Sequence, residues 1–128
     1  GTNTCTCSVG LVPTPSSVAL DVNNSVVVKY SHGLNSGKFL AVSRDNAGAE
    51  TTADTGITVA AGTGYVVTVC IDKARSEARY YIDGVFVARI TANLPSSAAT
   101  GQRAVIVKSA GTTSRTLVVA SFMFNSIF

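Results

Sequence analysis

The chain has 128 residues, of which 46% are hydrophobic and 13% are charged, and its formal net charge is +3. This length predicts one domain with a core of its own, and so low a charged fraction argues against a disordered chain. No apolar run approaches the roughly 20 residues that a membrane-spanning helix needs. The Lys and Arg residues are spread singly rather than in a patch, so we expect neither a nucleic-acid nor a membrane partner.

The first fifteen residues, Gly1–Pro15, show no hydrophobic periodicity and contain two Pro and two Gly residues. They predict an extended N-terminal arm whose order depends on the surface it lies against, followed by a single domain over residues 16–128. Cys5 and Cys7 are two residues apart, which is not the C-x₂-C spacing of a zinc knuckle. A disulfide from either cysteine to another subunit stays open as an alternative.

Short β-favouring runs follow along the chain, separated by turn residues. Strands are predicted over residues 16–20, 25–30, 38–44, 50–54, 65–72, 80–82, 85–88, 104–108 and 114–124, with a break after 55–59. The strand over 65–72 contains Cys70, which we expect to be a small buried hydrophobe. Short strands with turn signals about every 8–12 residues predict an all-β fold, an antiparallel β-sandwich or a barrel.

The hairpin around Asp83 and Gly84 carries the clearest local signal. An Asp-Gly pair between apolar runs is typical of a type I′ turn, because that turn needs φ > 0 at both central residues. An unbroken ladder from this turn sets two faces. One holds Ala78, Tyr80 and Ile82 with Val85, Val87 and Arg89, and the other holds Arg79 and Tyr81 with Phe86, Ala88 and Ile90. Because both faces are largely apolar, we expect the hairpin to lie in the middle of a sheet and to be covered on both sides.

Few residues support catalysis. His32 is the one histidine and lies in a Gly/Ser/Asn loop, where we expect it to be solvated. The acidic residues fall mostly at turns, and metalloprotease, nucleophile-elbow, Ca²⁺-loop and phosphate-loop motifs are missing from the sequence. The four tyrosines sit in apolar runs, so core packing explains them better than sugar stacking does. We therefore expect a protein that is not an enzyme, with glycan binding left open but not favoured.

Five pieces from Lys38 onward occur in a recognisable order. They are residues 41–45 (AVSRD), 52–63 (TADTGITVAAGT), 80–88 (YYIDGVFVA), 93–95 (NLP) and 108–115 (KSAGTTSR). In these pieces the chain resembles the concanavalin A-like (laminin-G-type) jelly-roll module of tailed-bacteriophage virion proteins. The resemblance covers about the last 90 residues and implies two antiparallel sheets packed face to face, in a shortened form.

The chain departs from that family at the positions that would carry a ligand. Gly64 stands where family members often have an aromatic residue, typically Trp, and Ala120-Ser121 stand where an acid usually follows the final Leu-x-Val. These departures argue against an inherited ligand or Ca²⁺ site, so no cofactor or metal is expected. The missing N-terminal strands would leave apolar area for a partner to cover.

The resemblance implies a virion structural protein on the capsid surface, assembled in the host cytoplasm. We expect a decoration (cement or head-fibre) subunit that binds the major capsid (coat) protein, stabilises the shell and self-associates as a homotrimer. The alternative is a tail-fibre or head-fibre module that binds a carbohydrate receptor. Predicted partner contacts are Cys5, Cys7, Leu11 and Val12 in the arm, and Phe122, Met123, Phe124, Ile127 and Phe128 at the end, for which core packing is an equal alternative.

Overall fold

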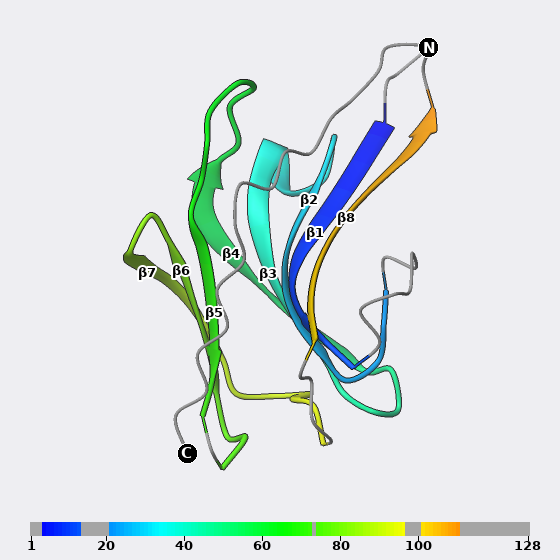
Figure 1. The fold of residues 1–128 in the computed structure, drawn as a ribbon, viewed down its shortest axis with the longest axis vertical. Coiled ribbons are helices and arrows are strands. Elements are labelled where there is room, and N and C mark those ends of the chain that lie inside the picture. Colours follow the sequence, from blue (N-terminus) through cyan, green and yellow to red (C-terminus); the bar gives the residue numbers. More distant parts are fainter. Residues whose placement is uncertain (1–3, 14–20, 73, 97–100, 111–128) are drawn as a thin grey trace.

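A computed structural model describes residues 4–13, 21–72, 74–96 and 101–110, which form two antiparallel sheets (Figure 1). The strands are β1 (Thr4–Val12), β2 (Ser25–Ser31), β3 (Lys38–Arg44), β4 (Glu50–Thr58), β5 (Val67–Ile71), β6 (Ala78–Ile82), β7 (Val85–Ile90) and β8 (Gly101–Ala110). In those ranges the single helical segment is the 3₁₀ turn η1 (Asn35–Gly37). The predicted all-β sandwich is confirmed.

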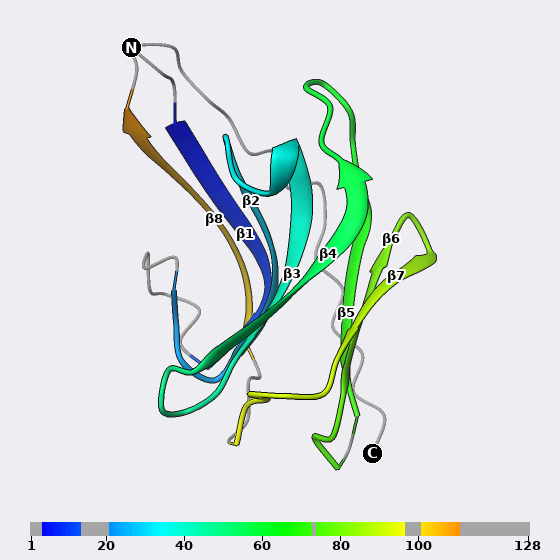
Figure 2. The ribbon, with the colours of Figure 1, turned by 180° about the vertical axis from the view of Figure 1, so that it is seen from behind.

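Each sheet consists of strands that are consecutive in the sequence, except that β8 joins the sheet of β1 to β4. Strands β1 to β4 follow one another as antiparallel neighbours, and β8 returns to pair with β1, giving a five-stranded sheet of order β4-β3-β2-β1-β8. Strands β5, β6 and β7 form the three-stranded sheet in sequence order. Seen from the front and from behind, β4 runs beside β7 along one side of the sandwich (Figures 1 and 2).

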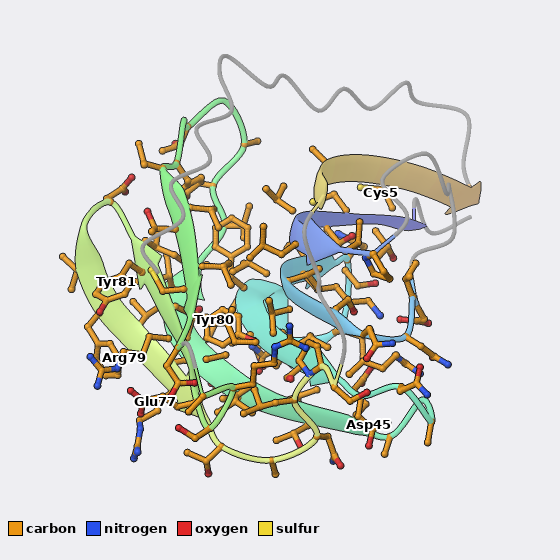
Figure 3. All side chains as sticks on the ribbon, turned by 60° about the horizontal axis from the view of Figure 1, so that its bottom comes forward. Cys5, Asp45, Glu77, Arg79, Tyr80 and Tyr81 are labelled. Atoms are coloured by element: carbon orange, nitrogen blue, oxygen red, sulfur yellow. The ribbon has the colours of Figure 1, made fainter. Side chains whose placement is uncertain are left out.

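The core lies between the two sheets. It is built from apolar side chains of both layers: Val26, Val28, Phe39 and Ala41 from one, and Ala78, Tyr80, Ile82, Ala88 and Ile90 from the other. Tyr80 is fully buried, and its hydroxyl donates a hydrogen bond of 2.7 Å to the carbonyl oxygen of Val42 in the opposite sheet. Its side chain points into the body of the molecule (Figure 3). Burial raises the pKa of Tyr80, so the hydroxyl stays a donor.

The five-stranded sheet is also buried on the side away from that core. Val12, Val27 and Val42 form a second apolar cluster there, and each is almost inaccessible to solvent. On the same side, Asp21 bonds to the ammonium of Lys29 at 3.0 Å and lies 3.6 Å from the guanidinium of Arg44. These two contacts hold the chain around Asp21 against β2 and β3.

The predicted N-terminal arm is corrected for residues 4–12, which form β1 inside the five-stranded sheet. This strand pairs with β2 on one side and β8 on the other. Its small and polar side chains do not show the alternation by which a strand is recognised in a sequence. The small size of one of them lets the neighbouring strand pack closely. A Cβ atom built on Gly10 would lie 2.3 Å from the carbonyl oxygen of Val26, so only glycine allows β2 to approach this closely.

The predicted turn of the β6–β7 hairpin is confirmed. Asp83 has φ = 52° and Gly84 has φ = 76°, the two positive values that a type I′ turn needs. Asp83 also ties the hairpin to the start of β5. Its backbone N–H donates to the carbonyl oxygen of Val66, and its carboxylate accepts from the N–H of Val66, both at 2.8 Å.

The predicted faces of the hairpin are wrong beyond the turn, because β7 contains a bulge. Tyr81 pairs with Phe86, but Tyr80 pairs with Ala88, which leaves Val87 as an extra residue. The shift brings Ala88 and Ile90 into the core beside Tyr80 and moves Arg89 to the other face. The hairpin is therefore buried on one face only, and β7 is an edge strand rather than the middle of the sheet.

Most other predicted strands hold, with small differences in extent. Strand β4 continues past the predicted end at Asp54 to Thr58, because the buried hydroxyl of Thr55 donates to the carbonyl oxygen of Phe39 at 2.7 Å and keeps the strand on β3. The strand predicted over 65–72 is shorter in the structure, where β5 covers Val67–Ile71. The strands predicted over 16–20 and 114–124 lie outside the described residues.

Candidate functional site

The outward face of the three-stranded sheet gathers exposed aromatic and charged side chains. Strand alternation brings them to one side, since residues 66, 68 and 70 point away from the core while residues 67, 69 and 71 are partly buried. Pairing between strands then aligns Thr68 with Tyr81 and Phe86, and Cys70 with Arg79 and Arg89. We call this face the outer patch and define it by Val66, Thr68, Arg79, Tyr81, Phe86 and Arg89.

The apolar half of the outer patch is held in a fixed geometry. The rings of Tyr81 and Phe86 meet edge to face, with centroids 5.7 Å apart and an interplanar angle of 71°. Phe86 is nevertheless 52% exposed and Val66 is 65% exposed. Large apolar side chains that are both ordered and exposed on one face are typical of a surface that another molecule covers.

The charged half consists of two guanidinium groups on one carboxylate. Glu77 lies 2.6 Å from a terminal nitrogen of Arg79 and 2.5 Å from Nε of Arg89. The hydrogen bond from Arg89, with the charge of Arg79, holds the pKa of Glu77 below its usual value. Figure 3 shows Glu77, Arg79 and Tyr81 projecting from the same side of the molecule, away from Tyr80. The two arginines and the one glutamate carry one net positive charge, which the neighbouring carboxylate of Asp72 on the same face offsets.

A shallow hollow of about 300 Å³ lies beside these residues, lined by Cys70, Ile71, Asp72, Glu77, Arg79 and Tyr81. Asp72 is occupied by its own turn, since it accepts hydrogen bonds from the backbone N–H groups of Ser76 and Glu77 and from the hydroxyl of Ser76. These bonds, led by the one from the Ser76 hydroxyl, lower the pKa of Asp72. Both carboxylates at the hollow are thus held ionised and bonded, an arrangement suited to binding rather than to proton transfer.

The structure places the predicted arm contacts within the sandwich. Leu11 packs against the core between the sheets, and Val12 is fully buried in the cluster on the other side. Cys5 and Cys7 are half-buried on the same side of β1 as Leu11. Burial raises the pKa of the Cys7 thiol, and the neighbouring Cys5 adds to the effect. That any of these residues contacts a partner stays a prediction, and Phe122, Met123, Phe124, Ile127 and Phe128 lie outside the described residues.

Two residues of the outward face were predicted to be buried. Cys70 is exposed rather than buried, because it lies on the outward side of an edge strand. Tyr81 packs against Phe86 outside the core, whereas Tyr30, Tyr65 and Tyr80 do pack in it. The sequence offered no signal for this face, since the unbroken ladder put Arg79 and Arg89 on opposite faces and only the bulge at Val87 brings them together. His32 is exposed in its loop, as predicted.

No protein-family model, curated protein or solved structure matches this chain. Among the residues that the structure describes, no three His, Cys, Asp or Glu side chains come together as metal ligands. In the same part of the chain, no helix has the length and apolar character to cross a membrane.

Proposed function

We propose that this chain is a structural protein of a bacteriophage virion, a decoration subunit that binds the coat-protein shell and stabilises it. The observation that carries the proposal is the outer patch, where an exposed Phe86 packed edge to face on Tyr81 and two exposed arginines share one sheet face. Tyr, Phe and Arg are enriched in the cores of protein–protein interfaces. The partner is inferred from the ordered motifs that resemble virion jelly-roll modules, for which two antiparallel sheets are the expected coarse architecture.

The mechanism is binding linked to shell stability. A subunit that binds only the assembled shell lowers the free energy of that state and leaves the dissociated coat protein unchanged. Stabilisation then rises with the concentration of the decoration subunit until its sites are full. A homotrimer, the self-association state that we propose, multiplies the effect because three linked contacts act together.

The test compares shells with and without this chain. Particles stripped of the protein are heated beside intact particles, and release of the packaged genome is followed with a nucleic-acid dye. We expect stripped particles to open at a lower temperature, and re-addition of purified chain to restore the difference in a saturable way. If stripped particles resist heat as well as intact ones do, the chain does not act as cement.

A second function, recognition of host glycan by a tail or head fibre, has one observation in its favour. Exposed aromatic rings such as Phe86 stack on the apolar faces of sugars. A glycan array probed with the purified chain distinguishes the two functions. Specific binding that Phe86→Ser abolishes, together with no effect of the chain on shells, would favour the fibre function.

A further inference from the structure

We propose that Cys5 and Cys7 form a binding site for one soft, thiophilic metal ion of the Cu(I) class. Both residues lie on β1, which is hydrogen-bonded to β2 on one side and to β8 on the other. The site is on the five-stranded sheet and is separate from the outer patch. The inference goes beyond the proposed function, because it depends neither on a shell nor on a coat protein.

The strand places the two thiols on the same side of the sheet. Alternate residues of a strand point the same way, and the register of β1 with β8 is unbroken from Cys5 to Cys7. On the other side, the N–H of His32 donates to the carbonyl oxygen of Cys5 at 3.0 Å, which continues the pairing with β2. Figure 3 shows Cys5 where β1 and β8 run side by side.

The two cysteines are free thiols that lie within electrostatic reach of each other. Neither forms a disulfide, and both are half-buried, so part of each side chain is accessible to an ion from solvent. Burial is the main cause that raises the pKa of the Cys7 thiol, and the charge of Cys5 is the next. Two neighbouring thiolates therefore repel each other, and a cation bound between them removes that repulsion.

The spacing of the two thiols suits a metal ion better than a disulfide bond. Two residues of a strand span about 6.6 Å, and their Cβ atoms are about as far apart, whereas the Cβ atoms of a disulfide are about 3.8 Å apart. A metal ion held in line between two sulfurs separates them by about 4.6 Å, twice a metal–sulfur bond of about 2.3 Å. Each sulfur then has to lean toward the other by only roughly 1 Å, and β1 keeps its pairing.

The available ligands select the metal. Thiolates are soft ligands that favour Cu(I), zinc and iron–sulfur clusters, and structural zinc sites almost always have four ligands. In the described residues no third His, Cys, Asp or Glu side chain joins the pair, and the sequence has none of these residue types at its other positions. Cu(I) accepts two thiolates in a linear arrangement, so the pair completes its coordination. On binding, each thiol releases its proton to solvent and each sulfur donates an electron pair to the ion, which stays Cu(I).

Competition with a chelator tests the site on the full chain. The reduced, oxygen-free protein is mixed with the coloured complex of Cu(I) and bicinchoninate, and loss of colour measures transfer of Cu(I) to the protein. We expect the wild-type chain to take up one ion per chain with no change in its elution volume in gel filtration. Cys5→Ala and Cys7→Ala should each lose the ion. Cys70→Ala is the matched control, because it removes an exposed thiol of the other sheet and should keep the ion.

Several results would overturn this site. Loss of the ion in Cys70→Ala, or a larger particle in gel filtration after Cu(I) is added, would mean that copper joins other thiols or separate chains. His32→Ala and Met123→Leu remove the other donors that Cu(I) accepts, and both should keep the ion. Loss of the ion in either would mean that a third ligand completes the site. Uptake by Cys5→Ala or Cys7→Ala equal to that of the wild type would exclude the pair.

Thermal unfolding separates a site built by the strand from two thiols that bind copper in any conformation. Without metal, Cys5→Ala and Cys7→Ala should unfold cooperatively near the wild-type midpoint, which shows that loss of the ion is not loss of the fold. Cu(I) should raise the midpoint of the wild type and of Cys70→Ala but not that of Cys5→Ala, because a ligand that prefers the folded state stabilises it. An unchanged wild-type midpoint would show that the unfolded segment binds the ion as tightly, and would overturn β1 as the origin of the site.

Discussion

The two sheets of this sandwich carry similar apolar residues but use their outer faces differently. On the five-stranded sheet, Val27 and Val42 point away from the central core and are still buried, with Asp21 held across the same side by Lys29 and Arg44. On the three-stranded sheet, the corresponding outward side chains are left open to solvent. The five-stranded sheet is therefore stabilised by packing on both faces, whereas the three-stranded sheet is stabilised by packing on its inner face and exposes its outer face to solvent.

This difference separates fold from function within one domain. Packing on both faces makes β2 and β3 the base of the sandwich, since Val27 and Val42 are covered on the outer side and Leu40 is partly buried beside them. The three-stranded sheet needs only its inner face for stability, so its outer residues are free to serve a contact. Variants on each sheet test this division, and the largest effect is expected at Tyr80, which joins the two sheets.

Tyr80→Ala should be the most damaging change, because Tyr80 is fully buried and bridges the sheets through its bond to Val42. We expect a loss of about 3–5 kcal/mol in the free energy of unfolding, as for other large aromatic truncations in cores. Tyr80→Phe keeps the ring and removes the hydroxyl, so it should cost about 1 kcal/mol. Urea unfolding followed by far-ultraviolet circular dichroism measures both. Equal losses for the two variants would mean that the hydroxyl bond, and not the ring, joins the sheets.

Gly10→Ala tests how tightly the five-stranded sheet is built. The new methyl group would lie 2.3 Å from the Val26 carbonyl oxygen and 2.6 Å from the Cα atom of Val27, so β1 and β2 must move apart. We expect destabilisation of about 1–3 kcal/mol, the usual range for overpacking. Gly64→Ala is the control, because nothing lies within 4 Å of the position of its Cβ atom. A Gly10→Ala chain as stable as Gly64→Ala would show that β1 does not pack this closely.

The same substitution on the two outer faces compares the sheets directly. Val27→Ala removes two buried methyl groups and should cost about 2 kcal/mol, whereas Val66→Ala removes exposed ones and should change stability by less than about 0.5 kcal/mol. Chemical denaturation at one pH and temperature measures both. Similar values for the two variants would contradict the proposed division between a buried and an open outer face.

Sequence patterns predicted the fold better than the site, and the hairpin shows why. The Asp-Gly pair encodes its turn locally, so the positive φ values of Asp83 and Gly84 were predictable. The bulge at Val87 has no such local signature, because it is set by which residues fit between the sheets. Without the bulge, Arg79 and Arg89 fall on opposite faces. With it, they share one face with Tyr81 and Phe86, and the outer patch exists.

Strand β1 shows a second way in which the sequence prediction failed, because a paired strand was predicted to be an extended arm. Its pattern of Thr, Cys, Ser and Gly lacks the alternation of large apolar and polar residues that indicates a half-buried strand. It is a strand because β2 and β8 pair with its backbone, and pairing between segments that are distant in the sequence cannot be predicted from local residue patterns. By contrast, β2 and β3 were predicted almost residue for residue, since their apolar runs are buried or partly buried on both faces.

The pH dependence of stability should change when the charged half of the outer patch is altered. The pKa of Glu77 in the folded chain lies below its ordinary value of 4.5, first through the hydrogen bond from Arg89 and then through the charge of Arg79. The folded chain therefore binds fewer protons in acid than the unfolded chain does, and this contribution to stability is present above pH 4.5 and lost as the pH falls below it. We expect Glu77→Gln to lower the unfolding midpoint at pH 7.

That deficit should shrink as the pH falls below 4.5, because Glu77 of the wild-type chain is then progressively protonated. Asp54 and Asp72 also have lowered pKa values, but they are common to both chains and cancel in the difference. The measurement is a thermal unfolding series from pH 3 to pH 7 at low salt. A deficit that stays constant with pH would show that Glu77 acts through packing and not through its charge.

The mildest test leaves stability unchanged and uses the native cysteines as reporters of the two sheets. Cys70 is exposed on the outward face of β5, whereas Cys7 is half-buried on β1 and has a raised pKa, so a smaller fraction of it is thiolate at pH 8. Iodoacetamide should therefore modify Cys70 fastest and Cys7 slowest in the folded chain, as followed by peptide mass spectrometry. In 8 M urea the rates should converge, because the thiols lose their different surroundings. If Cys7 reacts as fast as Cys70 in the folded chain, the inner face of β1 is not covered by the opposite sheet. The difference between a sheet that is buried on both faces and one that is exposed on its outer face would then be supported only by the comparison of Val27 with Val66.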